Sequence, residues 1–156
     1  MINTQSFGNK LKALNYDFYS GVPCSFLTPL INYAINECSF IMASNEGDAV
    51  SICAGANLGK RKSVVFMQNS GLTNAVSPIT SLLYTFQIPI LGFVSLRGEE
   101  HLNDEPQHEL MGKITPELLS LQNVEWDFLA TTDEEIDAQL KKADDCINQN
   151  KSFFFI

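Results

Sequence analysis

Short apolar runs alternate along the chain with longer segments in which apolar residues recur every three or four positions. Runs such as KSVVFMQ and IPILGFVSL have the length and the branched residues of buried strands. The longer segments have the spacing of helices that bury one face. This alternation predicts one α/β domain with a mostly parallel six-stranded sheet. The predicted strands are residues 17–22, 39–44, 62–68, 88–96, 125–131 and 153–156, and the predicted helices are residues 3–14, 27–34, 44–59, 69–86, 115–121 and 131–150.

Capping residues predict where two of these helices begin. Ser44 or Asn45 has the side chain to cap the third helix, which Gly59 then ends. The segment TTDEE (131–135) has capping-box spacing in two registers, so the last helix is expected to begin after Thr131 or Thr132.

Two prolines and a long polar stretch divide the middle of the chain. Pro78 is expected to bend the helix within residues 69–86. Residues 97–115 show no apolar periodicity and exceed ordinary loop lengths, which favours a functional loop. Thr115 is expected to cap a short helix that has Pro116 at its first position.

Composition excludes several classes of protein. The chain has 156 residues, is 45% apolar and carries a net charge of −8, which suits one globular domain and argues against a nucleic-acid partner. No segment is long enough to be a membrane span. The four cysteines, Cys24, Cys38, Cys53 and Cys146, form no CxxC pair, and we expect reduced thiols in a cytoplasmic protein.

Four polar segments containing glycine or charged residues follow the first four predicted strands. They are GVPCS, SNEGD, QNSGLTN and RGEEHLNDEPQH. Ligands of open α/β sheets bind at the carboxyl ends of the strands, so these segments are expected to gather at one edge of the sheet. Glu46, within SNEGD, lies among them.

Glu46 has two interpretations from the residues alone. A carboxylate in the first turn of a helix is favoured by the helix dipole and needs no further role. The helix that follows, however, is rich in small residues, among them Ala49, Ala54 and Gly55, which suits deep packing or an interface. A carboxylate shielded there would have a raised pKa and could share a proton with a ring nitrogen, the chemistry that activates thiamine diphosphate.

Longer motifs carry a resemblance to a known family. GVPCSFL, ASNEGDAVSICAGANL, VVFMQNSGLTNAVSPITSLL, IPILGFVSLRGE and DEPQHELMGKIT resemble, in order, motifs of the phosphonopyruvate and sulfopyruvate decarboxylases. They cover roughly residues 15–116. The resemblance implies a three-layer sandwich of the pyrimidine-binding type found in thiamine diphosphate enzymes. It also implies a part in decarboxylating phosphonopyruvate, to phosphonoacetaldehyde and CO₂, or sulfopyruvate.

The resemblance also implies roles for individual residues. Glu46 matches the glutamate that activates the cofactor's aminopyrimidine. The other cofactor-binding residues that it implies are Gly21, Val22, Pro23, Ser70, Gly71 and Asn74, and the expected substrate residues are Cys24, Ser25, Arg97 and His108. Gly98, Asp104, Glu105, Pro106 and Gln107 complete the motif after the fourth strand.

Two positions depart from the family pattern. Cys24 stands where the family commonly has aspartate, and Thr73 stands where it commonly has glycine. Cys24 as a catalytic nucleophile is a weaker alternative, because no nearby residue in the sequence supplies a base. His101 and His108 are seven residues apart, a spacing that does not favour a metal pair, and we predict no metal ligands here.

The resemblance further implies a partner. Enzymes of this cofactor class bind the diphosphate through Mg²⁺ on a second domain that carries a GDG motif, and this sequence has no GDG. The Mg²⁺ ligands and the diphosphate-binding domain are therefore expected outside this sequence, in a homo- or hetero-oligomer. The small-residue helix and the apolar FFFI segment (153–156) favour an oligomer as well. The alternative is a non-catalytic assembly or regulatory subunit.

Overall fold

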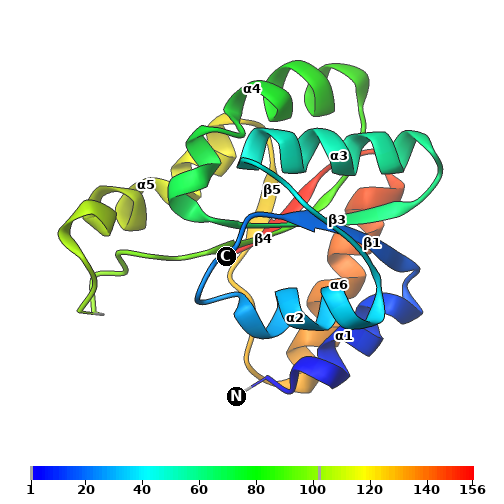
Figure 1. Cartoon of the computed structure of the whole chain (residues 1–156), viewed down its shortest axis with the longest axis horizontal. Helices are drawn as coiled ribbons and strands as arrows, with labels where there is room; N and C mark the ends of the chain where they lie inside the picture. Colours follow the sequence, from blue (N-terminus) through cyan, green and yellow to red (C-terminus); the bar gives the residue numbers. More distant parts are fainter. Residues whose placement is uncertain (1, 102) are drawn as a thin grey trace.

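The computed structural model describes residues 2–101 and 103–156. A six-stranded sheet runs through the molecule in the order β2-β1-β3-β4-β6-β5, and every neighbouring pair is parallel (Figure 1). The predicted sheet is confirmed, and its second, fourth, fifth and sixth strands along the chain are shorter than expected. The strands are β1 (Tyr16–Gly21), β2 (Ser39–Met42), β3 (Lys62–Gln68), β4 (Leu91–Ser95), β5 (Glu125–Asp127) and β6 (Phe153–Phe155).

Helices cover both faces of the sheet and give the predicted three layers (Figure 1). Each face has its own buried apolar cluster, because the parallel strands are apolar on both sides. One face is covered by α1 (Thr4–Ala13), α2 (Thr28–Glu37) and α6 (Asp133–Asn148), and the other by α3 (Glu46–Leu58), α4 (Val76–Pro78), the π-helix η2 (Ile79–Tyr84) and α5 (Glu109–Leu121). The short 3₁₀ helices are η1 (Asn69–Thr73) and η3 (Pro106–His108).

The FFFI segment does not need a partner to cover it. β6 lies between β4 and β5, and Phe153, Phe154 and Phe155 are at most 1% exposed within this chain. Phe153 and Phe155 pack on the α1–α6 face and Phe154 on the α3–α5 face. Burying a phenylalanine contributes about 1.5–3 kcal/mol each. The expectation that this segment favours an oligomer is therefore wrong.

Helix α3 begins and ends as predicted. Asn45 is its N-cap, and the Asn45 side chain accepts a hydrogen bond from the backbone N–H of Asp48 at 2.9 Å. Gly59 is the C-cap. The small residues serve two different faces: Ala49 and Ala54 are fully buried, whereas a Cβ on Gly55 would meet nothing within 4 Å.

Helix α6 uses the second of the two capping registers. The backbone N–H of Glu135 donates to the Thr132 hydroxyl, and that hydroxyl donates to the Glu135 carboxylate at 2.6 Å.

Helix α5 differs from the prediction. It begins at Glu109, not after Thr115, so Pro116 lies inside it and the preceding loop is shorter than expected. Proline removes the hydrogen bond to the carbonyl four residues earlier, which is that of Gly112. The Thr115 hydroxyl donates to the carbonyl of Met111 at 2.5 Å, inside the same turn. Met111, Ile114, Leu118 and the buried Leu119 continue the helical apolar face across the proline, so packing outweighs the lost bond.

Pro78 marks a change of helix type rather than a simple bend. The α-helical turn ends at Pro78, and residues 79–84 form a π-helix. The Thr80 hydroxyl donates to the carbonyl of Val76 at 2.8 Å, which satisfies a backbone group at the junction.

No helix in the described part of the chain is long and apolar enough to cross a membrane. Within residues 2–101 and 103–156, no group of three His, Cys, Asp or Glu side chains is arranged to hold a metal ion.

Candidate active site at the carboxyl ends of the strands

The four predicted segments meet at one edge of the sheet. The segment after β2 contacts the one after β3, through Glu46 and Asn74. The segment after β1 contacts the end of β4, through Cys24 and Ser95. The segments after β3 and β4 are joined through Asn69 and the backbone of Arg97. This clustering follows from the strand order, because β2, β1, β3 and β4 are consecutive neighbours in the sheet.

Glu46 is held against the turn that follows β3. It is the first residue of α3, and its Oε2 accepts a hydrogen bond from Nδ2 of Asn74 at 2.9 Å. A Cβ built on Gly71 would lie 2.1 Å from Cδ and Oε1 of Glu46, so only glycine leaves room for this carboxylate. The Glu46 side chain is half-buried, and its shielding from water within this chain is incomplete.

The turn after β1 lies tightly over the sheet edge. A Cβ on Gly21 would lie 2.6 Å from the carbonyl oxygen of Phe66, and the backbone N–H of Val22 donates to the same carbonyl at 3.2 Å. Pro23 and Ser25 are exposed beside it. Ser70, on the next turn, is also exposed and accepts a hydrogen bond from Gln68 at 2.7 Å.

Cys24 is buried and lies against β4. Its Sγ is 3.2 Å from the Oγ of Ser95, and only 6% of each residue is exposed. No described histidine or carboxylate forms a hydrogen bond with this thiol, so the geometry gives no general base for a nucleophilic cysteine. The sequence did not single out Ser95, which is a small polar residue at the end of an apolar strand.

Arg97 is paired within its own loop. Its Nε donates to Oδ2 of Asp104 at 2.7 Å, its Nη2 donates to Oδ1, and its guanidinium lies 4.7 Å from the ring centroid of Phe26. The hydrogen bond from Arg97, with backbone N–H donors from Glu105 and Gly98, holds the pKa of the Asp104 carboxyl well below its usual range. Two of the five guanidinium N–H donors are thus committed to Asp104.

Asn69 joins three elements, and the sequence did not identify it. The side chain is fully buried; its Nδ2 donates to the carbonyl of Arg97 at 2.8 Å and to the Thr115 hydroxyl at 3.1 Å. Its Oδ1 accepts from the backbone N–H of Arg97 at 3.3 Å. An asparagine directly after a strand with a mostly apolar middle, VVFM (64–67), was the available signal.

The two histidines differ in their surroundings. His101 is exposed. His108 is half-buried at the start of α5, and its Nδ1 is buried without a hydrogen-bond partner among the described residues. A Cβ on Gly98 would lie 2.0 Å from the His108 carbonyl oxygen, so the loop after β4 closes directly onto this histidine.

Two known decarboxylases are similar to most of this chain. Phosphonopyruvate decarboxylase from Streptomyces viridochromogenes is 41% identical over 138 residues, which is 87% of this chain and 35% of that protein. Sulfopyruvate decarboxylase subunit alpha from Methanococcus maripaludis is 36% identical over 121 residues, which is 76% of this chain and 71% of that subunit. The chain belongs to this decarboxylase family. It spans about a third of the length of the phosphonopyruvate decarboxylases it matches, 35% and 34% in two Streptomyces proteins.

Solved structures confirm the fold of this decarboxylase-family chain. Benzoylformate decarboxylase from Polynucleobacter necessarius has a TM-score of 0.76 at 20% identity and covers 99% of this chain and 29% of its own. An enzyme from Mycobacterium smegmatis described as thiamin diphosphate-dependent has a TM-score of 0.73 at 14% identity, covering 97% of this chain and 29% of its own. No protein-family profile matches the chain. The predicted pyrimidine-domain type of fold is thus confirmed.

Proposed function

We propose that this chain is the pyrimidine-binding part of a thiamine diphosphate-dependent decarboxylase. Its substrate would be a 2-oxo acid that carries a phosphonate or sulfonate group, as the names of the relatives suggest. The proposal rests on the position of the Glu46 carboxylate at the carboxyl edge of the sheet. Asn74 orients this carboxylate by a hydrogen bond, and Gly71 leaves room for it.

The residues around Glu46 fit the pyrimidine ring of the cofactor. Asn74 donates to Oε2, whereas Oε1 has no hydrogen-bond partner among the residues described. This oxygen is the atom at which Glu46 would accept or return a proton on a ring nitrogen. When bound, thiamine diphosphate supplies the carbon nucleophile and the electron sink that decarboxylation requires.

Asn74 and Gly71 determine how the Glu46 carboxylate is oriented for that proton exchange. The amide of Asn74 holds one carboxylate oxygen, which fixes the plane of the group before a ligand arrives. Covering this half-buried carboxylate with a ring and a second protein surface removes water from it. Such desolvation favours sharing of a proton over full ionisation.

The substrate-binding role is proposed for the neighbouring cluster. Cys24, Ser25, Arg97 and His108 lie on the segments after β1 and β4. Arg97 can offer its other guanidinium N–H donors to a phosphonate or sulfonate, since Asp104 fixes the guanidinium in place. The buried Nδ1 of His108 is a second group that a polar ligand could satisfy.

A partner is part of the proposal. The relatives named subunit alpha are, by that name, parts of larger assemblies, and this chain covers 71% of one of them. We propose that a diphosphate-binding domain or subunit supplies the Mg²⁺ ligands and covers Glu46. The partly exposed carboxylate supports this, because the described residues shield it only incompletely from water.

Substitution of Glu46 tests the proposal. The chain is combined with a diphosphate-binding domain or subunit of this decarboxylase family, and CO₂ release from phosphonopyruvate and from sulfopyruvate is followed with thiamine diphosphate and Mg²⁺. Glu46→Gln is expected to lower kcat by roughly 100-fold to 10,000-fold, the range of a lost proton transfer.

Asp48→Asn is the matched control, because Asp48 is an acid in the same first turn of α3 and, among the described residues, its carboxylate accepts a hydrogen bond only from Asn45. It should keep nearly full activity. Equal, small effects of both substitutions would mean that Glu46 only stabilises the helix start. No activity in the assembled wild type would favour the non-catalytic subunit instead.

A further inference from the structure

One arginine at the carboxyl edge of the sheet is held from three directions. Asp104 accepts two hydrogen bonds along the edge of the Arg97 guanidinium, and Phe26 lies over its face, with Cζ 4.7 Å from the ring centroid. Asn69 holds the backbone of Arg97, because it accepts from the backbone N–H and donates to the carbonyl. The guanidinium is therefore restricted to one place, unlike that of a freely rotating surface arginine.

Stability alone gives little reason for this arrangement. Only 16% of the Arg97 side chain and 11% of the Asp104 side chain are exposed. An ion pair that is largely removed from water contributes little net stability, because the cost of desolvation offsets the attraction. Phe26 stays 52% exposed although its ring lies on the guanidinium. A fixed cation with an aromatic cover has instead the character of a preorganised anion site.

The short helix that begins with Asn69 also holds Glu46. Gly71, the third residue of η1, leaves room for the Glu46 carboxylate. Asn74, the C-cap of η1, donates to the same carboxylate at 2.9 Å. Asn69, at the other end of η1, is fully buried and bonded to Arg97. One helical turn therefore fixes where the Arg97 backbone lies relative to the Glu46 carboxylate.

We propose that Asn69 and Phe26 are positioning residues that hold Arg97 for the anionic group of the substrate. Asn69 fixes the distance between Arg97 and the Glu46 side of the site, and Phe26 fixes the tilt of the guanidinium. Both residues thereby determine how strongly the enzyme prefers a 2-oxo acid with a phosphonate or sulfonate over the same acid without it. The inference rests on the proposed function, in which Arg97 binds that anionic group.

The test compares two substrates that differ by the anionic group. One is phosphonopyruvate or sulfopyruvate, whichever the assembled enzyme turns over faster, and the other is pyruvate. The preference is the ratio of the two kcat/KM values. Arg97→Met should lower this preference about tenfold to 100-fold, the range of a hydrogen bond to a charged group. Asn69→Ala should lower it about tenfold and Phe26→Leu about threefold, mainly by raising KM for the substrate that carries the anionic group.

Double variants show whether both residues act through Arg97. When Arg97→Met is already present, neither Asn69→Ala nor Phe26→Leu should lower the preference further, because the guanidinium that they position is gone. Thr115→Val is the control for Asn69. It removes the hydroxyl that accepts from Asn69 but leaves both bonds between Asn69 and Arg97, so it should keep the preference even if stability falls.

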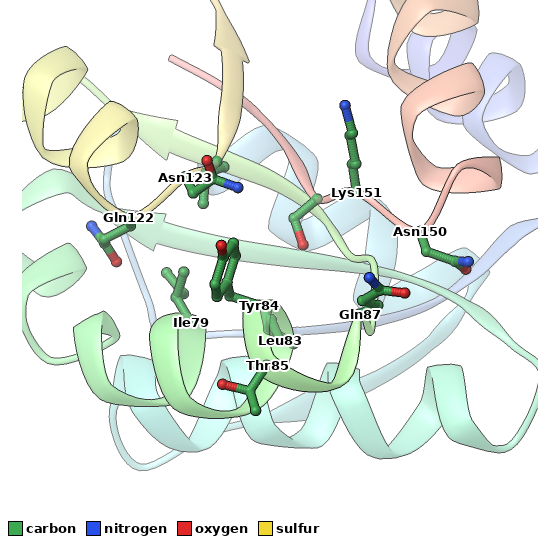
Figure 2. Close-up of a pocket in the computed structure, with 11 residues that line it drawn as sticks. Ile79, Leu83, Tyr84, Thr85, Gln87, Gln122, Asn123, Asn150 and Lys151 are labelled. Carbon is green, nitrogen blue, oxygen red and sulfur yellow. The ribbon is translucent and has the colours of Figure 1, made fainter.

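The control for Phe26 lies at the opposite edge of the sheet. Tyr84 is 61% exposed and lines a separate pocket of about 510 Å³ beside the amino ends of β4, β5 and β6 (Figure 2). Tyr84→Leu removes an exposed ring, as Phe26→Leu does, but one that is distant from Arg97. It should leave the preference unchanged.

A second measurement needs neither substrate nor cofactor. The Nε–H of Arg97 donates to Asp104 at 2.7 Å, and its NMR signal reports how firmly the guanidinium is held. In the unassembled chain, Asn69→Ala and Phe26→Leu should each make this N–H exchange faster with solvent. Thr115→Val and Tyr84→Leu should leave its exchange rate near that of the wild type.

The outcomes separate this inference from the proposed function. If Arg97→Met lowers the preference but Asn69→Ala lowers kcat/KM equally for both substrates, or Phe26→Leu keeps the wild-type preference, the inference is overturned and the proposed function stands. If Arg97→Met keeps the preference, or the assembled wild type releases no CO₂, the substrate role of Arg97 fails and the inference fails with it. Asn69→Ser replaces Asn69→Ala if the latter does not fold, because one hydroxyl cannot reproduce both bonds to Arg97.

Discussion

Replacing Gly71 with alanine should move the Glu46 carboxylate and leave the fold in place. The added Cβ would lie 2.1 Å from Cδ and Oε1 of Glu46, whereas ordinary contacts begin near 3.4 Å. The carboxylate must therefore retreat by about 1.3 Å. It can do so because it is the far end of a flexible side chain, and Gly71 has no positive φ that alanine would strain.

The retreat has a large effect on activity and a small effect on stability. A misplacement of about 1 Å can cost a reaction about 100-fold in rate, or about 2.7 kcal/mol in activation free energy. The hydrogen bond from Asn74 to Glu46 would be lost, which lowers the free energy of unfolding by only about 1 kcal/mol. We therefore expect kcat to fall about 100-fold while the thermal midpoint moves by only a few degrees.

CO₂ release by the assembled enzyme measures kcat, and circular dichroism measures the thermal midpoint. Gly55→Ala is the matched control, because a Cβ at Gly55 meets nothing within 4 Å. It should leave kcat unchanged and stabilise α3 by about 0.5–1 kcal/mol.

A double variant tests whether the effect passes through Glu46. If Gly71→Ala acts by displacing that carboxylate, adding it to Glu46→Gln should lower kcat little further. Both changes then remove the function of the same carboxylate, so their effects do not add. Full activity of Gly71→Ala with a normal thermal midpoint would refute the reasoning. Fully additive losses of kcat in the double variant would also refute it, because they would mean that Gly71→Ala acts on a group other than the Glu46 carboxylate.

The loop after β4 provides two further predictions, both measured by urea unfolding. Asn69→Ala should lower the free energy of unfolding by about 2–4 kcal/mol, because it leaves buried backbone groups of Arg97 without partners; a loss below about 0.5 kcal/mol would contradict this. The pKa of Asp104 is lowered by its hydrogen bond to Arg97, so the stability it contributes is present above its unfolded pKa of about 3.9 and is lost as pH falls through the folded value. The difference in unfolding free energy between wild type and Asp104→Asn should thus be full at neutral pH and shrink below about pH 4; a difference that is constant with pH would contradict the pairing.

The sequence predicted those features that depend on neighbouring residues. Apolar runs identified the strands, and Asn45 and the TTDEE segment identified the starts of α3 and α6, because caps act within one turn. Pro116 was misleading: proline is favoured at a first helical turn, and only the packing of Leu118 and Leu119 reveals that the helix continues through it.

The site was predictable where topology alone decides it. Segments that follow parallel strands must share an edge, and the Glu46–Asn74 contact confirms that the segments after β2 and β3 do. The role of Asn69 depends on partners 28 and 46 residues away, which no local pattern contains. The proposed roles of Cys24, Ser25, Arg97 and His108 stay predictions.

The position of β6 has a consequence for how the protein is made. Among the described strands, β5 pairs with β6 alone, and β6 is also the neighbour of β4, so a strand that follows the other five in the sequence joins two parts of the sheet. On the ribosome, residues 125–127 have no strand to pair with until residues 153–155 emerge. Synthesis of residues 153–155 therefore completes two ladders at once, and losing those few residues would leave both β4 and β5 with an open edge.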